Sequence, residues 1–161
     1  MLETIEDVSS YIKKTVPFKG LDLKSVNRLN GGIINYIYRL TFSDESTAVL
    51  KYYPAFIATN KQIPFSQSRY FVEKSALEIF GQNKDLNETT NIRVPKVLFS
   101  DDDNYVIIMQ DAGKELLLLS EVLKMDNISD EKLDSIAQEI YNFSKFLTEK
   151  SNVTPTSHKV N

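Results

Sequence analysis

Residues 29–40 read LNGGIINYIYRL, and the segment VLK follows at residues 49–51. The first stretch predicts the end of one strand, a Gly-Gly turn and a returning strand rich in alternating aromatic and β-branched side chains. A polar turn at residues 43–46 separates this strand from the next one, which carries VLK. The sequence therefore predicts an antiparallel meander of three strands over 23–29, 35–42 and 47–53.

The same stretch indicates a candidate phosphate-binding site at one end of the meander. Glycines at 31 and 32 let backbone amides approach a phosphate closely, because no Cβ stands in the way. Lys51 on the neighbouring strand can supply a point charge to the same phosphate. The alternatives are a plain hairpin turn for Gly31-Gly32 and an exposed strand lysine for Lys51.

Hydrophobic periodicity and turn residues predict the other elements of the chain. These are a helix over 2–16 ended by Pro17 and Gly20, a loop over 55–67, a helix over 69–80 with Gly81 as its C-cap, a loop over 83–91, strands over 94–99 and 105–109, a helix over 116–124, a helix over 129–150 that Ser129 caps, and a disordered tail over 151–161. The apolar run at 105–109 is typical of a buried, central strand. Up to about residue 110 this order predicts an α+β sheet domain.

Composition narrows the class of protein. The chain has 161 residues, of which 42% are hydrophobic and 25% charged, as in a soluble globular domain. A net charge of −3 argues against a partner that is a nucleic acid or an anionic membrane. The chain has no cysteine, no apolar run of transmembrane length and an acidic first segment unlike a secretion signal, so we expect a cytoplasmic protein.

Four ordered segments resemble one family of kinases. They are the glycine loop with its returning strand, Val49-Leu50-Lys51, residues 69–77 (RYFVEKSAL), and Val94-Pro95-Lys96-Val97 with residues 106–111 (VIIMQD) behind it. In this order they resemble the N-terminal lobe of the aminoglycoside phosphotransferase and choline kinase-like kinases, and most of all the methylthioribose kinase type. The resemblance implies a protein-kinase-like, α+β N-lobe with a five-stranded antiparallel sheet and a packed helix. It implies an N-lobe over 1–110, and a hinge with the first helices of an α-helical C-lobe over 111–150.

The resemblance also assigns roles around ATP. Backbone amides of Gly31, Gly32 and Asn35 would cover the phosphates, and Lys51 would contact their oxygens while paired with Glu73. Glu78 is a rival for that pairing. Met109, Gln110 and Asp111 would form the hinge that reads the adenine edge, with Val49 and Ile108 as apolar neighbours of the base; Met109 as ordinary core is the alternative.

Other polar groups are expected to be structural. The cluster Asp101-Asp102-Asp103-Asn104 lacks the spaced glycine and final glutamate of a calcium loop, so we expect a solvated turn. His158 is expected to be exposed and non-catalytic.

The sequence departs from the family in one respect. The His-Gly-Asp loop, its downstream asparagine and the second metal-binding aspartate of the family are not found here, so no catalytic residue or magnesium ligand is assigned. We expect a truncated chain that is inactive alone and binds nucleotide weakly. It would need a separate C-lobe chain or self-associate through an exposed apolar face. The alternatives are a non-catalytic binding or regulatory module of the kinase fold and an unrelated α+β domain.

Overall fold

The computed structural model describes residues 1–15, 21–30, 32–81, 83–113 and 115–151. Its helices are α1 (Ile5–Thr15), α2 (Arg69–Gly81), α3 (Lys84–Thr89), α4 (Leu119–Val122) and α5 (Asp130–Ser151). Its strands are β1 (Leu23–Arg28), β2 (Tyr36–Phe42), β3 (Thr47–Tyr52), β4 (Phe56–Ile57), β5 (Asn60–Pro64), β6 (Val97–Asp101) and β7 (Val106–Gln110). Pro17, Gly20, Gly31, His158 and the predicted tail beyond Ser151 lie outside the described residues.

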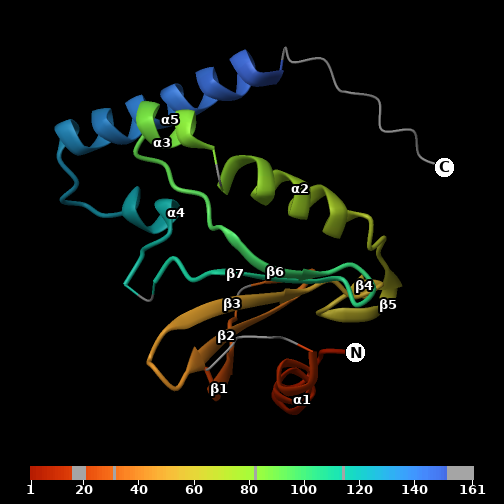
Figure 1. Ribbon diagram of the computed structural model, residues 1–161. Coiled ribbons are helices and arrows are strands. Elements are labelled where there is room, and N and C mark those ends of the chain that lie inside the picture. Colours follow the sequence, from red (N-terminus) through yellow and green to blue (C-terminus); the bar gives the residue numbers. More distant parts are fainter. Residues whose placement is uncertain (16–20, 31, 82, 114, 152–161) are drawn as a thin grey trace. The chain divides into compact units, whose positions relative to one another are not determined.

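An antiparallel sheet of five strands in the order β1-β2-β3-β7-β6 forms the centre of the fold (Figure 1). The predicted meander is present as β1, β2 and β3. The predicted apolar strand is β7, which pairs with β3 on one side and β6 on the other, and its first four residues are buried. The predicted fold class, α+β with a five-stranded antiparallel sheet and a packed helix, is therefore confirmed, and it is consistent with a kinase-like N-lobe.

Helix α1 covers one face of this sheet (Figure 1). Its apolar positions recur every three to four residues, so Val8 and Ile12 fall on one side and are buried against the strands. Burying each such side chain contributes about 2 kcal/mol. Tyr38 of β2 is fully buried on this face, and its hydroxyl donates a hydrogen bond to the Leu2 carbonyl at 3.2 Å. The segment before α1 is thereby fastened to the sheet.

Helix α2 packs against a second buried cluster, formed by Tyr53, Tyr70, Ile107 and Met109. The Tyr70 ring meets the Tyr53 ring edge to face, with centroids 5.4 Å apart, an arrangement that aromatic quadrupoles favour. At the end of α2, a Cβ added to Gly81 would stand 3.0 Å from the Pro95 carbonyl oxygen. The close approach of the Pro95 carbonyl leaves little room for a side chain at this position. Gly81 is the last residue of α2 and not the C-cap that the sequence predicted.

The turn between β6 and β7 fastens both helices to the sheet, and it is the solvated turn predicted for residues 101–104. The Asp101 carboxylate accepts hydrogen bonds from the backbone N–H groups of Asp103 and Asn104, and from the Tyr11 hydroxyl of α1 at 2.6 Å. Asp102 accepts from the Tyr70 hydroxyl at 2.6 Å and from Lys74 at 2.7 Å, both on α2. These carboxylates are therefore engaged by protein donors.

Two segments predicted as loops contain secondary structure. Residues 55–67 hold the two-stranded hairpin of β4 and β5, whose second strand is exposed at every position and so shows no alternation of polarity. Residues 83–91 hold α3, which begins where the Asn83 side chain accepts a hydrogen bond from the Leu86 N–H at 3.1 Å. Two predicted bounds also shift, since β6 begins at Val97 and α4 spans four residues.

By its contacts the chain divides into two compact units, residues 1–82 with 94–113 and residues 83–93 with 114–161. The second unit holds α3, α4 and α5, and Asn91 binds both carboxylate oxygens of Glu139 on α5 within it. The Ser129 side chain caps α5 as predicted. The domain bounds predicted from the sequence stay a prediction.

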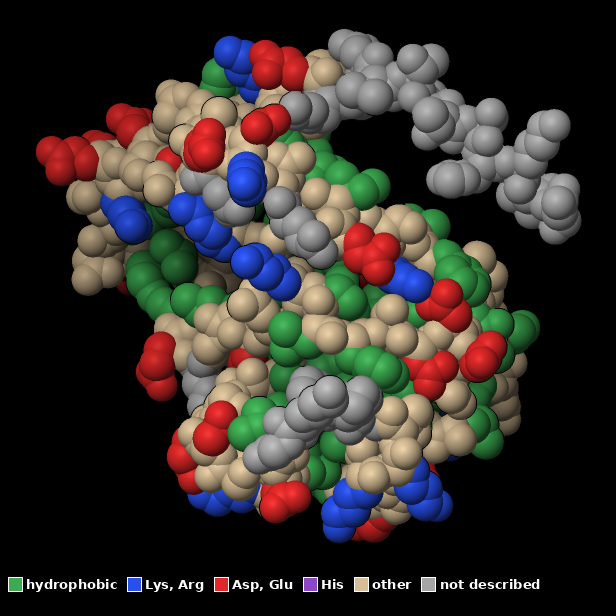
Figure 2. Space-filling view, in the orientation of Figure 1, with side chains coloured by type: hydrophobic (Ala, Val, Ile, Leu, Met, Phe, Trp, Pro, Cys, Tyr) green, Lys and Arg blue, Asp and Glu red, His purple; other side chains and the backbone are tan. Residues whose placement is uncertain are grey.

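The surface of the protein carries side chains of both charges (Figure 2). On the face drawn in Figure 2, acidic and basic side chains are interspersed. Within the described residues, every helix is too short or too polar to cross a lipid bilayer.

Candidate functional site

The candidate site is built on the sheet face that α2 covers in part. Two cross-strand rows define it, Ile37–Lys51–Ile107 and Arg39–Val49–Met109, each contributed by β2, β3 and β7. Because side chains alternate between the two faces along a strand, these six residues point to the same side. Val49 packs there against the cluster that contains Ile107 and Met109. The sheet thus sets Lys51 beside an apolar surface.

Lys51 forms an ion pair with Glu73 of α2. Its Nζ lies 2.5 Å from Oε1 of Glu73, and the exposed fractions of the two side chains are 18% and 35%. The pairing expected from the resemblance is present, and the rival Glu78 lies exposed on the same helix. A charged hydrogen bond of this kind restrains a flexible lysine and offsets part of the cost of burying its ammonium group. Lys51 is therefore held at one place above the sheet.

The aromatic ring of Tyr53 also contacts Lys51. Lys51 Nζ stands 5.3 Å from the centroid of the ring, close enough for a cation–π interaction. The Tyr53 side chain is fully buried, and its hydroxyl has no hydrogen-bond partner among the described residues. Burial and the nearby Glu73 carboxylate raise the pKa of this hydroxyl far above its ordinary range. Tyr53 belongs to the Tyr52-Tyr53-Pro54 segment that continues the resemblance after Lys51, but the resemblance assigns it no role at the site.

The glycine loop connects β1 to β2 at the Lys51 end of the site. Gly32 is exposed, and a Cβ added there would meet Asn35 O at 3.5 Å and Ile37 Cδ1 at 3.6 Å, which are ordinary contacts. Protein neighbours therefore do not require this glycine, and its exposure leaves this part of the loop accessible to a ligand. The side chain of Asn35 accepts hydrogen bonds from Arg69, so its backbone is the part available to a phosphate.

The predicted hinge begins inside β7, since Met109 and Gln110 are the last two residues of the strand and Asp111 follows it. Met109 is buried beside Val49, and Gln110 is bound to Lys96 in two ways: its backbone N–H donates to the Lys96 carbonyl at 2.9 Å, and its side-chain oxygen accepts from the Lys96 N–H at 3.2 Å. The N–H of Gln110 is thus already engaged by Lys96, the residue before β6. A purine that bound at this edge would have to use backbone groups after Gln110.

Asp111 is held by Arg39, a residue that sequence analysis did not assign to the site. The guanidinium donates to both carboxylate oxygens, at 2.5 and 3.0 Å, and also to the Gly113 carbonyl at 3.1 Å. Burial acts to raise the pKa of Asp111, but the hydrogen bonds from Arg39 and from the Gly113 N–H outweigh it, and the net pKa is lowered. Gly113 takes a φ of +116°, which only glycine adopts freely, so the chain turns sharply here.

Ile108 was expected beside the base together with Val49, and the structure places them on opposite faces. Ile108 faces the α1 side and belongs to the same buried cluster as Leu50, its cross-strand partner. Neighbours along a strand point to opposite sides, so Ile107 and Met109 share the face of Val49 instead.

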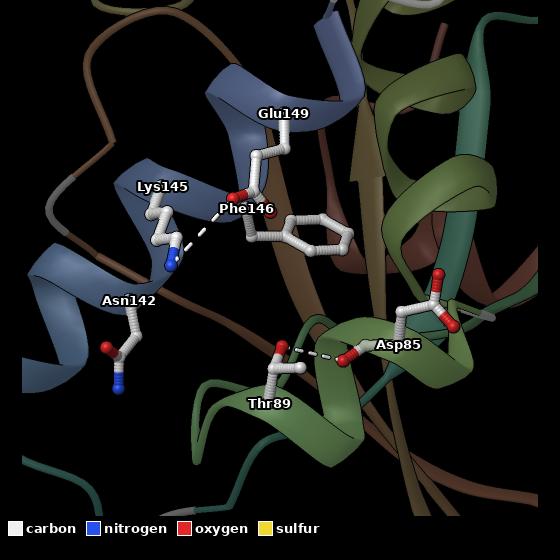
Figure 3. Close-up of a pocket in the computed structure, with 6 residues that line it drawn as sticks. All are labelled: Asp85, Thr89, Asn142, Lys145, Phe146 and Glu149. Carbon is white, nitrogen blue, oxygen red and sulfur yellow. Dashed lines mark hydrogen bonds and ion pairs between the residues drawn. The ribbon is translucent and has the colours of Figure 1, made fainter.

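A hollow of about 440 Å³ lies elsewhere, in the second unit, between α3 and α5 (Figure 3). The ring of Phe146 projects into it, and Lys145 lies 3.9 Å from Glu149 on the same helix. Asp85 and Thr89 of α3 line the other side. This lining mixes one cation with carboxylates, so it favours no single class of charged ligand, and we assign it no role.

No model of a protein family matches the chain, but the chain is similar to a known small-molecule kinase. Over 148 residues the chain is 24% identical to a 4-hydroxytryptamine kinase from Psilocybe cubensis. The aligned part covers 88% of this chain and 41% of that kinase, so the chain spans less than half the length of this relative. The similarity supports a distant, kinase-like relationship and leaves the particular family open.

Proposed function

We propose that this chain is the nucleotide-binding, N-terminal part of a small-molecule kinase of the aminoglycoside phosphotransferase-like kind, with the methylthioribose kinase type as the nearest model. It binds ATP, and the whole protein transfers the γ-phosphate to a hydroxyl group. The observation that carries the proposal is the Lys51–Glu73 ion pair at 2.5 Å, placed beside the glycine loop and the apolar surface of Val49 and Met109. The distant similarity to a small-molecule kinase supports it.

Each side chain has a physical role in this proposal. The Lys51 ammonium group offsets negative charge on the phosphate oxygens, and Glu73 keeps it in position. Val49 and Met109 offer an apolar surface to the adenine ring, whose edge meets backbone groups in the segment 111–113. Backbone amides of the glycine loop, at Gly32 and Asn35, cover the phosphates.

The proposal assigns neither a catalytic base nor a magnesium ligand to this chain. Among the described residues, His, Asp and Glu side chains do not gather in groups of three or more that could hold a metal ion. Phosphoryl transfer depends largely on positioning and on charge neutralisation by metal ions, so Lys51 alone would not support it. We therefore expect ATP binding from this chain and phosphoryl transfer only together with further residues.

A partner surface belongs to the same proposal. Four consecutive leucines, residues 116–119, are 45–67% exposed, and Leu123 is 52% exposed. Apolar side chains exposed together favour burial against another surface. A C-lobe, as a separate chain or as part of a longer one, or a second copy of this chain would provide it.

The proposal is tested by calorimetric titration of the chain with ATP, with and without Mg²⁺, for the wild type and Lys51→Ala. A hydrogen bond to a charged group contributes about 1.5–3 kcal/mol. Each 1.4 kcal/mol is tenfold in affinity, so the variant should bind about 10- to 100-fold more weakly. Lys24→Ala is the matched control, because Lys24 pairs with Glu45 on the exposed surface of β1 and should not affect binding.

A folded wild-type chain that does not bind ATP would contradict the proposal and leave a non-catalytic binding module as the alternative. Equal binding by Lys51→Ala would contradict the role given to Lys51. Circular dichroism of each variant establishes that the fold is retained.

A further inference from the structure

Arg69, the first residue of α2, forms hydrogen bonds to three separate segments of the chain. Its Nε and Nη2 donate to the Asn35 side-chain oxygen at 3.1 and 3.0 Å, and Nη2 also donates to the Pro54 carbonyl at 2.6 Å. Its Nη1 donates to the carbonyls of Phe65, at 3.2 Å, and Ser66. Every nitrogen of the guanidinium is thus bound by protein acceptors, so Arg69 has little left to offer a phosphate directly.

The glycine loop is held on its other side as well. The N–H groups of Ala58 and Thr59, in the turn between β4 and β5, donate to the carbonyls of Ile34 and Ile33, each at 3.1 Å. These two backbone hydrogen bonds therefore join the β4–β5 hairpin to the glycine loop. Arg69 closes this arrangement, because it binds the loop through Asn35 and the end of the hairpin through Phe65.

Arg69 stands four residues before Glu73, so the two lie on the same face of α2. Glu73 binds Lys51, and Arg69 binds the glycine loop. Both cations contact the Tyr53 ring, with Lys51 Nζ at 5.3 Å and Arg69 Cζ at 5.8 Å from its centroid. One turn of α2 thus reaches both parts of the candidate site.

We propose that Arg69 is a positioning residue that couples the glycine loop to the Lys51–Glu73 pair through its fork on Asn35, so that nucleotide phosphates meet a preassembled site. The inference rests on the proposed function, since it names the group that organises the same site. A flexible loop would have to be ordered when the nucleotide binds, and the affinity would fall by that cost. A lysine could replace the charge of Arg69 but not its planar fork.

A double-mutant cycle on the full chain tests this coupling. ATP affinity is measured by calorimetry for wild type, Arg69→Met, Asn35→Ala and the double variant, with Arg69→Lys to separate charge from geometry. We expect each single variant to weaken ATP binding about tenfold, because a loss of about 1.4 kcal/mol corresponds to that factor. The double variant should bind no more weakly than the singles, because both remove the same link. Arg69→Lys should behave like Arg69→Met.

Hydrogen exchange in the absence of nucleotide gives a second readout. The amides of Ala58 and Thr59, which donate to the loop carbonyls of Ile34 and Ile33, should exchange faster in Arg69→Met and Asn35→Ala than in wild type. Arg93→Met is the matched control, since Arg93 also binds backbone carbonyls, those of Thr90 and Ile92, in the second unit. It should leave exchange of the Ala58 and Thr59 amides unchanged.

The outcomes separate this inference from the proposed function. Additive effects in the cycle, or unchanged exchange at the loop in Arg69→Met, would overturn the coupling even where the wild type binds ATP and Lys51→Ala binds it more weakly. A folded wild type that fails to bind ATP would overturn the proposed function and the nucleotide part of this inference together. Faster loop exchange in that case would retain the structural link alone.

Discussion

Replacing Arg39 by methionine should leave the Asp111 carboxylate buried without the two hydrogen bonds that the guanidinium donates to it. The exposed fraction is 4% for the Asp111 side chain and 17% for that of Arg39, so little water can replace them. Removing one partner of a buried pair costs about 3–5 kcal/mol. Because the Gly113 N–H still binds the carboxylate at 3.0 Å, we expect about 2–3 kcal/mol from this substitution.

The assay is urea unfolding followed by far-ultraviolet circular dichroism, with thermal unfolding alongside. For a chain of this size 1 kcal/mol corresponds to about 2–4 °C in Tm, so the midpoint should fall by about 5–10 °C. The double variant Arg39→Met with Asp111→Leu should recover much of the loss, because it leaves no buried charge unpaired. Lys24→Met, which breaks the exposed pair with Glu45, should cost less than about 1 kcal/mol.

A loss for Arg39→Met no larger than that for Lys24→Met would refute the reasoning. It would mean that water reaches the Asp111 carboxylate and that Arg39 does not hold the segment after β7. A double variant less stable than Arg39→Met would also contradict it.

Three further predictions concern stability. Gly81→Ala should destabilise the fold by about 1 kcal/mol in urea unfolding, because the new Cβ meets the Pro95 carbonyl. The control is Ser75→Ala at an exposed position of α2, which should stabilise the fold by a few tenths of a kcal/mol. A gain in stability for Gly81→Ala would contradict the contact with Pro95. Tyr53→Phe should leave stability unchanged or raise it by up to about 1 kcal/mol, since it removes a buried hydroxyl without a partner, and a loss of stability would reveal a partner. Because the pKa of Asp111 is lowered below 3.8 in the fold, the ionised carboxylate stabilises the fold fully above that pH, and this stabilisation is lost as pH falls through the folded pKa. In urea unfolding at acidic pH, Asp111→Asn should therefore reduce the dependence of stability on pH. An unchanged dependence would contradict this prediction.

The sequence was sufficient for elements whose polarity alternates or recurs. In β2, Tyr36, Tyr38 and Leu40 are buried on one face, and in α1 a regular spacing places Val8 and Ile12 together. The strand β5 lacks this signal because all of its positions are exposed, and α3 is polar apart from Leu86. Local periodicity contains no information about such segments, since tertiary contacts and a cap decide their structure.

The candidate site could be predicted in part. Lys51 and Glu73 were found through an ordered resemblance, although 22 positions separate them. Arg39 and Asp111 are 72 positions apart, and Arg69 binds Asn35 34 positions away, in pairings that no motif records. Arg39 shares one face of β2 with Ile37 and Thr41. A charged side chain at a partly buried position of a strand requires a partner, so Arg39 could have been recognised as half of an ion pair. The sequence placed Ile108 beside Val49, whereas the register of β3 and β7 pairs Val49 with Met109.

The most direct test of the central claim is an ATP titration that follows backbone amide signals of the whole chain by nuclear magnetic resonance. If ATP binds beside Lys51, shifts should saturate together in residues 32–35, at Lys51 and in residues 109–113, with smaller changes around Glu73. Residues that line the hollow between α3 and α5, such as Thr89 and Phe146, should not shift, and they serve as an internal control. Shifts confined to that hollow, or no shifts in a folded chain, would contradict the claim that ATP binds beside Lys51.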